Sequence, residues 1–319
     1  MQMYPFKLEA IYKQRIWGGQ KLREVFKKDI PTGENIGESW ELADLPDDKS
    51  TILNGELAGR NLAELIAEYP EEVTGNSSFS GPFPLLIKFL DAEQALSVQV
   101  HPDTETCRRM GRGDPKTECW YIVSAKPGAV LYKGLKRGVT RGDFENALNN
   151  GTVENLLETI PVQAGECHFL PAGTAHSIGA GLLIAEIQTP SDTTYRVFDW
   201  NRVDVSGKPR QLHISEALES LHFDVCGRDL PITRIGRLVD CEFFTIEKGH
   251  QARGCELLLS AGVMNVLIFL TGFGTIRGGR EGVVDFRAGD CLLVPANYEG
   301  AVVCFVADTQ YLIVTPRSI

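Results

Sequence analysis

GECHFLPAGTAH, residues 165–176, is the stretch that decides the fold, and it follows the pattern G-x5-P-x-G-x2-H. Gly165 is expected to supply a turn before a short strand, while Pro171 and Gly173 shape a second turn after it. His176 then stands at the start of the next strand and faces the same interior. Short strands joined by such turns favour a sandwich or jelly roll.

Two earlier clusters can supply ligands to the same interior. Gln99 and His101 are two positions apart, so their side chains project from one face of a strand. Glu118 can join them from the following strand. Together with His176 they form a set of two imidazoles, one carboxylate and one amide oxygen, which suits zinc or a similar first-row ion. Glutamine is an uncommon zinc ligand, so Gln99 has the alternative role of a hydrogen-bonding side chain.

The rest of the chain reads as mainly β, with short strands punctuated by Gly, Pro and Asp and a few inserted helices. The helices are expected at residues 61–69, 103–111, 141–149, 153–158 and 214–221. Asp103 is a suitable N-terminal cap for the second of these. The strands are expected at 85–100, 118–123, 166–170 and 182–188, and throughout the segment from 241 to the end.

A degenerate internal repeat suggests a second β unit. GDCLLVPANYEG, residues 289–300, repeats the G-x5-P of residues 165–171 but has neither the later glycine nor the histidine. The second copy has therefore lost its metal ligands. We predict a metal-binding catalytic unit over residues 1–230 and a degenerate, non-catalytic β-barrel over residues 231–319.

Composition excludes several functional classes. A chain of 319 residues with 43% apolar side chains can bury a large core, and its net charge of -10 argues against nucleic acid or an anionic membrane as partner. The most hydrophobic stretch, residues 257–270, is too short to span a bilayer. The first 19 residues lack the apolar core of a secretion signal. The eight cysteines form no C-x-x-C pair, which indicates reduced thiols in a cytoplasmic protein.

Four runs carry a resemblance to a known family. They are PLLIKFLDAEQALSVQVHPD at 84–103, GESWE at 37–41, KTECW at 116–120 and SDTTYRVFDW at 191–200. Together they resemble the signature of the cupin-type mannose-6-phosphate isomerases, in the short bacterial form, over roughly the first two thirds of the chain.

The resemblance implies a fold of two cupin-like jelly-roll barrels, the second one degenerate. It also implies one Zn2+ per chain, held by Gln99, His101, Glu118 and His176, and an active-site role for Arg196. The implied reaction interconverts mannose 6-phosphate and fructose 6-phosphate through a cis-enediol, with a sugar phosphate as the partner molecule.

The chemistry of such a reaction points to further residues. A proton must leave the carbon beside a carbonyl and return to its neighbour, while a metal ion and cationic donors stabilise the enediolate. Arg196 is the first candidate donor, because its planar fork suits enediolate or phosphate oxygens. Two candidates for the base stay open. Glu186 lies on an otherwise apolar strand, where a carboxylate is costly unless it is paired or functional, and Arg196 is one possible partner. Lys116 shares a strand face with Glu118, and desolvation beside a cation would make it less basic.

Several other residues have predicted places. Ser97 shares the interior face with Gln99 and is a candidate phosphate ligand. The candidate substrate-binding residues are Ser97, Lys116 and Arg196. Trp17, Gly18 and Gly19 are expected to shape the cleft wall together with residues 38–41, although Trp40 could belong only to the core. Four charges are interpreted as surface charges rather than phosphate ligands: Lys133, Lys136, Arg137 and Arg202. Four histidines show no ligand spacing and are interpreted as ordinary: His168, His213, His222 and His250.

Two alternative functions remain from the residues alone. A cupin dioxygenase would use a similar site with iron, but it typically carries His-x-His where this chain has Gln99 and His101. A sugar-binding or regulatory cupin would keep the fold and bind ligand without turnover. Oxygen consumption and a turnover assay distinguish these from an isomerase.

Overall fold

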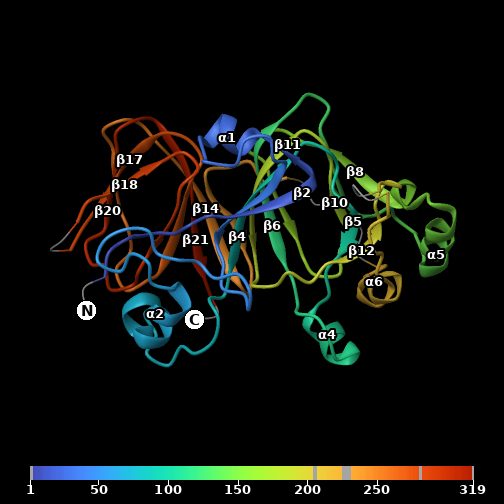
Figure 1. Ribbon diagram of the computed structural model, residues 1–319, viewed down its shortest axis with the longest axis horizontal. Coiled ribbons are helices and arrows are strands. Elements are labelled where there is room, and N and C mark those ends of the chain that lie inside the picture. Colours follow the sequence, from blue (N-terminus) through green and yellow to red (C-terminus); the bar gives the residue numbers. More distant parts are fainter. Residues whose placement is uncertain (1–2, 204–206, 225–230, 280–281, 318–319) are drawn as a thin grey trace.

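The structure is a computed structural model that describes residues 3–203, 207–224, 231–279 and 282–317. Its strands form four sheets, all with antiparallel pairing, and a few short helices accompany them (Figure 1). The expectation of a mainly β protein with few helices is confirmed. Within the described residues no helix is both long and apolar enough to cross a membrane.

Two sheets carry the residues of the predicted metal site, and we call them the N-terminal sheet pair. The six-stranded sheet has the order β2 (Ile11–Gly19), β3 (Ile36–Leu42), β4 (Leu86–Ala92), β11 (Leu182–Gln188), β6 (Glu118–Ala125) and β9 (Cys167–Leu170). The five-stranded sheet has the order β12 (Tyr195–Phe198), β5 (Val98–Val100), β10 (His176–Ile178), β7 (Val130–Leu135) and β8 (Leu157–Pro161).

The other two sheets form the C-terminal sheet pair. One has the order β1 (Phe6–Lys7), β19 (Cys291–Val294), β16 (Asn265–Phe269), β21 (Thr309–Pro316), β14 (Phe244–Gln251) and β13 (Gly236–Asp240). The other has the order β15 (Glu256–Leu258), β20 (Val302–Phe305), β17 (Phe273–Arg277) and β18 (Val284–Arg287). The N-terminal strand β1 thus pairs with β19, from the far end of the sequence.

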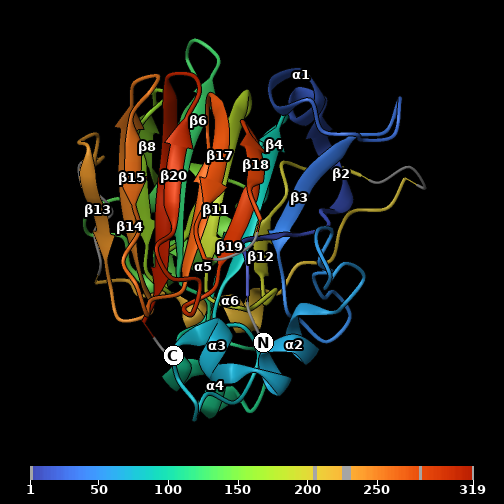
Figure 2. The ribbon, with the colours of Figure 1, turned by 90° about the vertical axis from the view of Figure 1, so that its left-hand side faces the viewer.

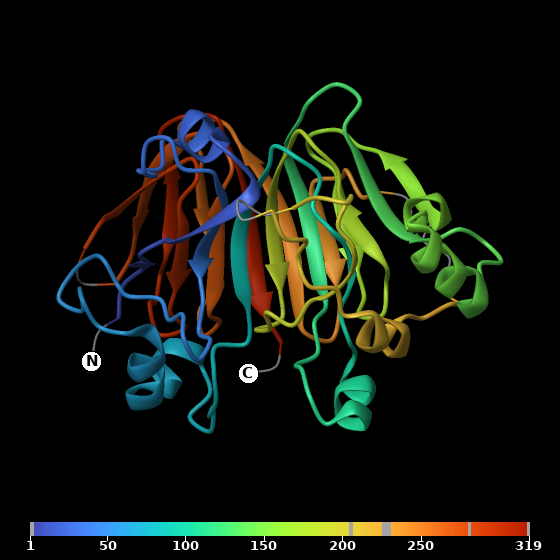
Figure 3. The ribbon, with the colours of Figure 1, turned by 45° about the vertical axis from the view of Figure 1, so that its right-hand side comes forward.

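The largest hydrophobic core joins the two six-stranded sheets. Phe89 and Ala185 from the N-terminal pair belong to the same buried cluster as Val266 and Val314 from the C-terminal pair. The two pairs consequently lie side by side, with β4 and β6 near β14 and β21 (Figures 1 and 3). Separate clusters fill the space within each pair. The structure is therefore held together at the middle by strands that are buried on both faces.

The helices are α1 (Lys21–Phe26), α2 (Leu62–Glu68), α3 (Pro70–Thr74), α4 (Thr104–Met110), α5 (Arg141–Asn150), α6 (Ile214–Ser220) and the 3-10 helix η1 (Val153–Leu156). Four predicted helices are confirmed as α2, α4, α5 and α6, and Asp103 caps α4 by accepting a hydrogen bond of 2.7 Å from Thr106 N. Helices α2, α3, α4 and α6 gather at one end of the strands, with α1 at the other (Figure 2).

Two predicted segments are wrong in part. The helix expected at 153–158 ends at Leu156, because residues from Leu157 pair with β7 as strand β8. The strand expected at 85–100 is two strands, β4 and β5, which lie in different sheets with a turn between them. The chain crosses here from one sheet of the pair to the other, between Ala92 and Val98.

The repeated G-x5-P motif has the same local structure in both copies. Gly165 and Gly289 have positive φ angles of 95° and 88°, and each precedes a short strand that ends just before the proline. The first copy continues through Gly173, whose φ is 83° and where a Cβ would lie 2.5 Å from His222 Nδ1. Only glycine fits this turn, and the turn delivers His176 to the start of β10.

Candidate metal centre and pocket

Three predicted ligands come together in the N-terminal sheet pair. His101 follows β5, Glu118 begins β6 and His176 begins β10, and all three are buried. Their ligand atoms lie within 4.8 Å of one another. The Nε2 atoms of His101 and His176 are each 3.3 Å from a different oxygen of Glu118. Segments far apart in sequence thus converge on one small buried volume.

Gln99 lies beside this group. It is directly opposite His176 in the β5–β10 pair, and its amide nitrogen is 3.3 Å from His176 Nε2. The hydroxyl of Ser97 is 3.4 Å from the amide oxygen of Gln99, a long hydrogen bond. The side-chain amide of Gln99 therefore lies near the position that a fourth ligand of a metal ion would occupy.

The polar atoms of the group fit a metal ion. Both oxygens of Glu118 are buried and receive no hydrogen bond from the described residues, although Lys116 Nζ lies 2.8 Å from Oε2. The Nδ1 atoms of His101 and His176 are each 2.8 Å from a backbone oxygen, of Thr193 and Thr174 respectively. Donation of Nδ1–H to these carbonyls leaves both Nε2 lone pairs directed at the centre, as metal ligation requires.

The protonation states favour the same conclusion. Burial lowers the pKa of His101 to about 3, with help from the nearby Lys116, and burial also lowers the pKa of His176. Burial alone would raise the pKa of Glu118, but Lys116 and the two imidazoles hold it well below its ordinary value. Neutral imidazoles and an ionised carboxylate are the forms that bind a divalent cation.

Lys116 lies beside the metal-binding group, as predicted. Its Nζ lies 2.8 Å from Glu118 and 3.1 Å from His101 Nε2, and the residue is buried. Burial alone would lower the pKa of Lys116, but the charges of Glu118 and Glu186 outweigh it and raise the pKa. The expectation of a less basic lysine concerns Lys116 beside a bound cation, so it stays a prediction.

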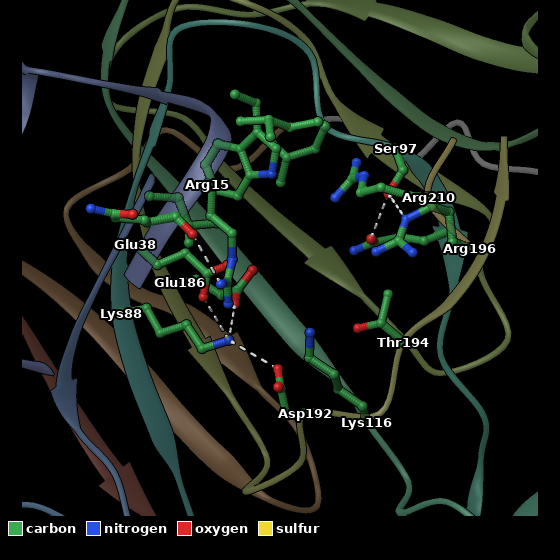
Figure 4. A pocket seen from close by; sticks show the side chains of 16 residues that line it. Arg15, Glu38, Lys88, Ser97, Lys116, Glu186, Asp192, Thr194, Arg196 and Arg210 are labelled. Carbon is green, nitrogen blue, oxygen red and sulfur yellow. Dashed lines mark hydrogen bonds and ion pairs between the residues drawn. The ribbon is translucent and has the colours of Figure 1, made fainter. Parts of the chain in front are cut away.

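A cavity of about 480 Å3 opens next to the metal-binding group (Figure 4). Gln99, Lys116 and Trp17 are part of its wall, so the predicted role of Trp17 as a cleft residue is confirmed. One side carries mixed charges, with Glu38, Lys88, Glu186 and Asp192, and the other carries Ser97, Arg196 and Arg210. The cavity thus has a charge-paired side and a cationic side.

The charge-paired side is built around Lys88. Its Nζ lies 3.6 Å from Glu186, 3.7 Å from Glu38 and 4.0 Å from Asp192. Glu186 also accepts a hydrogen bond of 2.9 Å from Trp120 Nε1, and burial raises the pKa of its carboxyl. The cation that pairs with Glu186 is therefore Lys88 and not Arg196.

Glu38 fixes the outer part of this side. It accepts hydrogen bonds from Arg15 Nε at 2.6 Å and from Trp40 Nε1 at 2.7 Å. Burial alone would raise the pKa of Glu38, but Lys88, Arg15 and these hydrogen bonds lower it to about 2. Trp40 is buried in the core, as its alternative interpretation allowed, and it also holds this carboxylate.

Two of these residues were missed from the sequence, Arg15 and Lys88, whereas Glu38 was expected in the cleft wall and is part of it. The rule that singled out Glu186, a charge on an otherwise apolar strand, applies equally to Lys88 in Leu86–Ala92. Glu38 lies inside the quoted GESWE run. Arg15 gave no signal, because its strand is neither apolar nor alternating.

The cationic side contains the predicted Arg196. Its Nε donates to Ser97 Oγ at 3.1 Å and its NH1 to Gln211 O at 2.9 Å. The predicted pair of Ser97 and Arg196 is thus brought together. Its role in catalysis or binding stays a prediction, as do the roles of Lys116 and Glu186.

Two charges interpreted as surface residues are not on the surface. Lys133 is 3% exposed, because β7 pairs with β10 and places it in register with His176. Arg202 is only partly exposed and donates to Ala95 O at 2.6 Å and to Asp199 Oδ1. The sequence did not reveal the burial of either residue, since strand register and tertiary contacts decide it.

The remaining histidines and the cysteines agree with the sequence analysis. The metal-binding group found among the described residues includes none of His168, His213, His222 or His250. Cys119 and Cys167 are free thiols on neighbouring strands, with their sulfur atoms 3.2 Å apart.

Comparison with known proteins identifies the family. Residues 5–143 match the family described as phosphomannose isomerase type I, catalytic domain. The mannose-6-phosphate isomerase of Streptococcus mutans is 38% identical over 297 residues, which cover 91% of this chain and 92% of that protein. The chain belongs to the type I phosphomannose isomerase family.

Further members of the type I phosphomannose isomerase family match over nearly their whole length. A mannose-6-phosphate isomerase of Bacillus subtilis is 33% identical over 324 residues, covering 96% of this chain and 99% of that protein. The crystal structure of the mannose 6-phosphate isomerase from Bacillus subtilis superimposes with a TM-score of 0.87 at 30% identity, covering 98% and 99% of the two chains. The resemblance to the short bacterial form is therefore confirmed.

Proposed function

We propose that this chain is a zinc-dependent aldose–ketose isomerase that interconverts mannose 6-phosphate and fructose 6-phosphate through a cis-enediol or enediolate. The observation that carries the proposal is the buried group of His101, Glu118 and His176 beside a cavity with a cationic wall. A sugar phosphate has two matching ends. Its hydroxyl and carbonyl oxygens suit the metal-binding group, and its phosphate dianion suits the cationic wall.

One zinc ion per chain would be held by His101, Glu118 and His176, with Gln99 as the fourth protein ligand. When bound, the ion supplies Lewis-acid stabilisation of negative charge on the substrate oxygens. The neutral imidazoles and the buried, ionised carboxylate support this assignment.

The residues of the cavity would orient the sugar and carry the proton. Lys116 and Glu186 are the two candidates for the base that moves a proton between C1 and C2. Both are buried at the cavity wall, where water is excluded and a proton can be retained. Arg196 and Ser97 would bind the anionic oxygens, since guanidinium stays charged and offers two parallel donors.

Architecture and location complete the proposal. The two sheet pairs would be two cupin-like jelly-roll barrels, with the catalytic one spanning residues 1–230 and the degenerate one residues 231–319. The repeated glycine turn at Gly165 and Gly289 supports a common origin of the two units. The free thiols Cys119 and Cys167 support a cytoplasmic location.

The test is an assay of the purified chain with mannose 6-phosphate, fructose 6-phosphate and glucose 6-phosphate. We expect turnover of the first two, abolished by EDTA and restored by zinc. Absence of such turnover would leave a sugar-binding cupin, and consumption of oxygen would indicate a dioxygenase.

The base is identified by label exchange in heavy water. We expect solvent hydrogen to enter C2 during turnover, and complete retention would indicate a hydride shift instead. Lys116→Gln and Glu186→Gln are then compared with the unchanged chain. The variant that loses exchange while still binding substrate lacks the base.

A further inference from the structure

The cationic wall of the cavity contains more positive charge than its acidic residues balance. Arg210 of this wall shares a single buried carboxylate, Asp199, with Arg202, which lies outside the wall, and Asp199 is 6% exposed. Within the described part of the chain no carboxylate lies within ion-pair distance of Arg196. Burial and the charge of Arg210 lower the pKa of Arg196, as expected when a positive group lacks a counter-ion. The wall is therefore suited to an anion from outside the chain.

Arg210 is held in a fixed orientation by Asp199. Its Nε donates to Asp199 Oδ2 at 2.7 Å and its NH2 donates to Oδ1. Burial alone would raise the pKa of Asp199, but the hydrogen bonds from Arg210 and Arg202 lower it and keep the carboxylate ionised. Such a two-point pair fixes the plane of the guanidinium.

The third nitrogen of Arg210 remains available to a ligand. NH1 makes no hydrogen bond within the described part of the chain, and the side chain is part of the cavity wall beside Arg196 and Ser97 (Figure 4). A guanidinium fixed on one edge and open on another can bind phosphate oxygens without losing further side-chain freedom.

Arg202 binds the same carboxylate but differs in every other respect. Its Nε donates to Asp199 O, its NH1 to Ala95 O and its NH2 to Asp199 Oδ1. All three nitrogens are therefore engaged with the protein. Arg202 is not part of the cavity wall. It is therefore a matched control, because it binds the same carboxylate as Arg210 but does not face the cavity.

We propose that Arg210, oriented by Asp199, binds the substrate phosphate together with Arg196 and determines the preference for phosphorylated over neutral sugars. The inference rests on the proposed isomerase function for the identity of the substrate. In this arrangement Asp199 is a positioning residue, because it acts through Arg210 and does not itself face the anion.

The experiment compares Arg210→Gln with Arg202→Gln in the zinc-loaded full chain. We expect Arg210→Gln to raise KM for mannose 6-phosphate and the inhibition constant of inorganic phosphate by about 10- to 100-fold, as for one lost hydrogen bond to a charged group. The turnover number at saturating substrate should change little, because the lost contact would stabilise the bound substrate and the transition state equally. Arg202→Gln should leave the phosphate constant within about threefold, its effect being confined to stability.

A double-mutant cycle tests the role of Asp199. Asp199→Asn should weaken phosphate inhibition in the unchanged chain but have no added effect in the Arg210→Gln background. A general structural role would weaken binding equally in both. Arg210→Lys, which keeps the charge but not the fork, should be intermediate, and it replaces Arg210→Gln if that variant does not fold.

Three results would overturn the inference: unchanged phosphate inhibition in folded Arg210 variants, an equal effect of Arg202→Gln, or additive effects of Asp199→Asn. Calorimetric titration of the EDTA-treated full chain with inorganic phosphate separates this inference from the isomerase proposal. Phosphate binding that depends on Arg210 without sugar-phosphate turnover would refute the proposed function and leave the anion site standing.

Discussion

Replacement of Glu38 by glutamine tests the electrostatic design of the cavity wall. The change keeps the side-chain shape but removes the charge that faces Arg15 at 2.6 Å and Lys88 at 3.7 Å. Lowering the pKa of Glu38 from 4.5 to about 2 is equivalent to about 3 kcal/mol of stability at neutral pH, at about 1.4 kcal/mol per pH unit. The side chain is only 11% exposed, so solvent screens little of this interaction.

The sign of the pH dependence follows from the lowered pKa. The carboxylate stabilises the fold fully above its unfolded pKa near 4.5, and the stabilisation is lost as the pH falls through the folded value near 2. The difference in unfolding free energy between the unchanged chain and Glu38→Gln should therefore be about 3 kcal/mol at pH 7. It should shrink to about 2 kcal/mol at pH 3.5.

Urea unfolding of both proteins at pH 7, 5, 4 and 3.5 measures this difference. Glu34→Gln is the control, because Glu34 accepts a solvent-exposed hydrogen bond from Gln14, the neighbour of Arg15, and is only partly buried. It should alter stability by less than about 0.5 kcal/mol at every pH. A Glu38→Gln effect below about 1 kcal/mol at pH 7, or one that does not shrink on acidification, would refute the reasoning.

Three further variants test other parts of the site. Glu118→Gln should lose zinc during dialysis that the unchanged chain survives, measured by metal analysis, and equal retention would contradict its role as ligand. Gly37→Ala should raise KM and destabilise by about 1–3 kcal/mol, because the new Cβ would lie 2.6 Å from a side chain of β2. Gly142→Ala should not destabilise, because the nearest atom to its new Cβ would be Thr140 Oγ1 at 3.9 Å, and similar melting temperatures for both variants would argue against the steric account. Trp120→Phe should cost about 1.5–3 kcal/mol in urea unfolding by removing the hydrogen bond to the buried Glu186, and a cost below 0.5 kcal/mol would show that water replaces the indole.

Local sequence patterns were sufficient to predict the elements whose ends are marked by a capping residue or a glycine turn. Helix α4 begins after Asp103 as predicted, since an N-terminal cap satisfies backbone donors whatever the tertiary context. The turn through Gly173 was also predictable, because a positive φ angle restricts the residue type. Strands such as β2 and β3 gave no such signal, as their burial depends on neighbours that are distant in sequence.

The metal-binding group was predictable for a different reason. Gln99 and His101 share a strand face by alternation, and only a few residue types can ligate zinc, so the search was short. The charge-paired side of the cavity was not predictable in the same way. The distances from Lys88 to three carboxylates arise from three different segments, and no local pattern encodes their convergence.

The sequence by itself determined three things: the donor set of two histidines and one glutamate, the mainly β fold class and the protein family. Only the tertiary structure decided which charges meet. It buried Lys133, gave Glu186 the partner Lys88, placed Lys116 Nζ 2.8 Å from Glu118, and separated Arg210 from Arg202 around one carboxylate. The physical reason is that ligand identity is a property of residue type, whereas pairing and protonation depend on distances of a few ångströms across strands that the sequence keeps far apart.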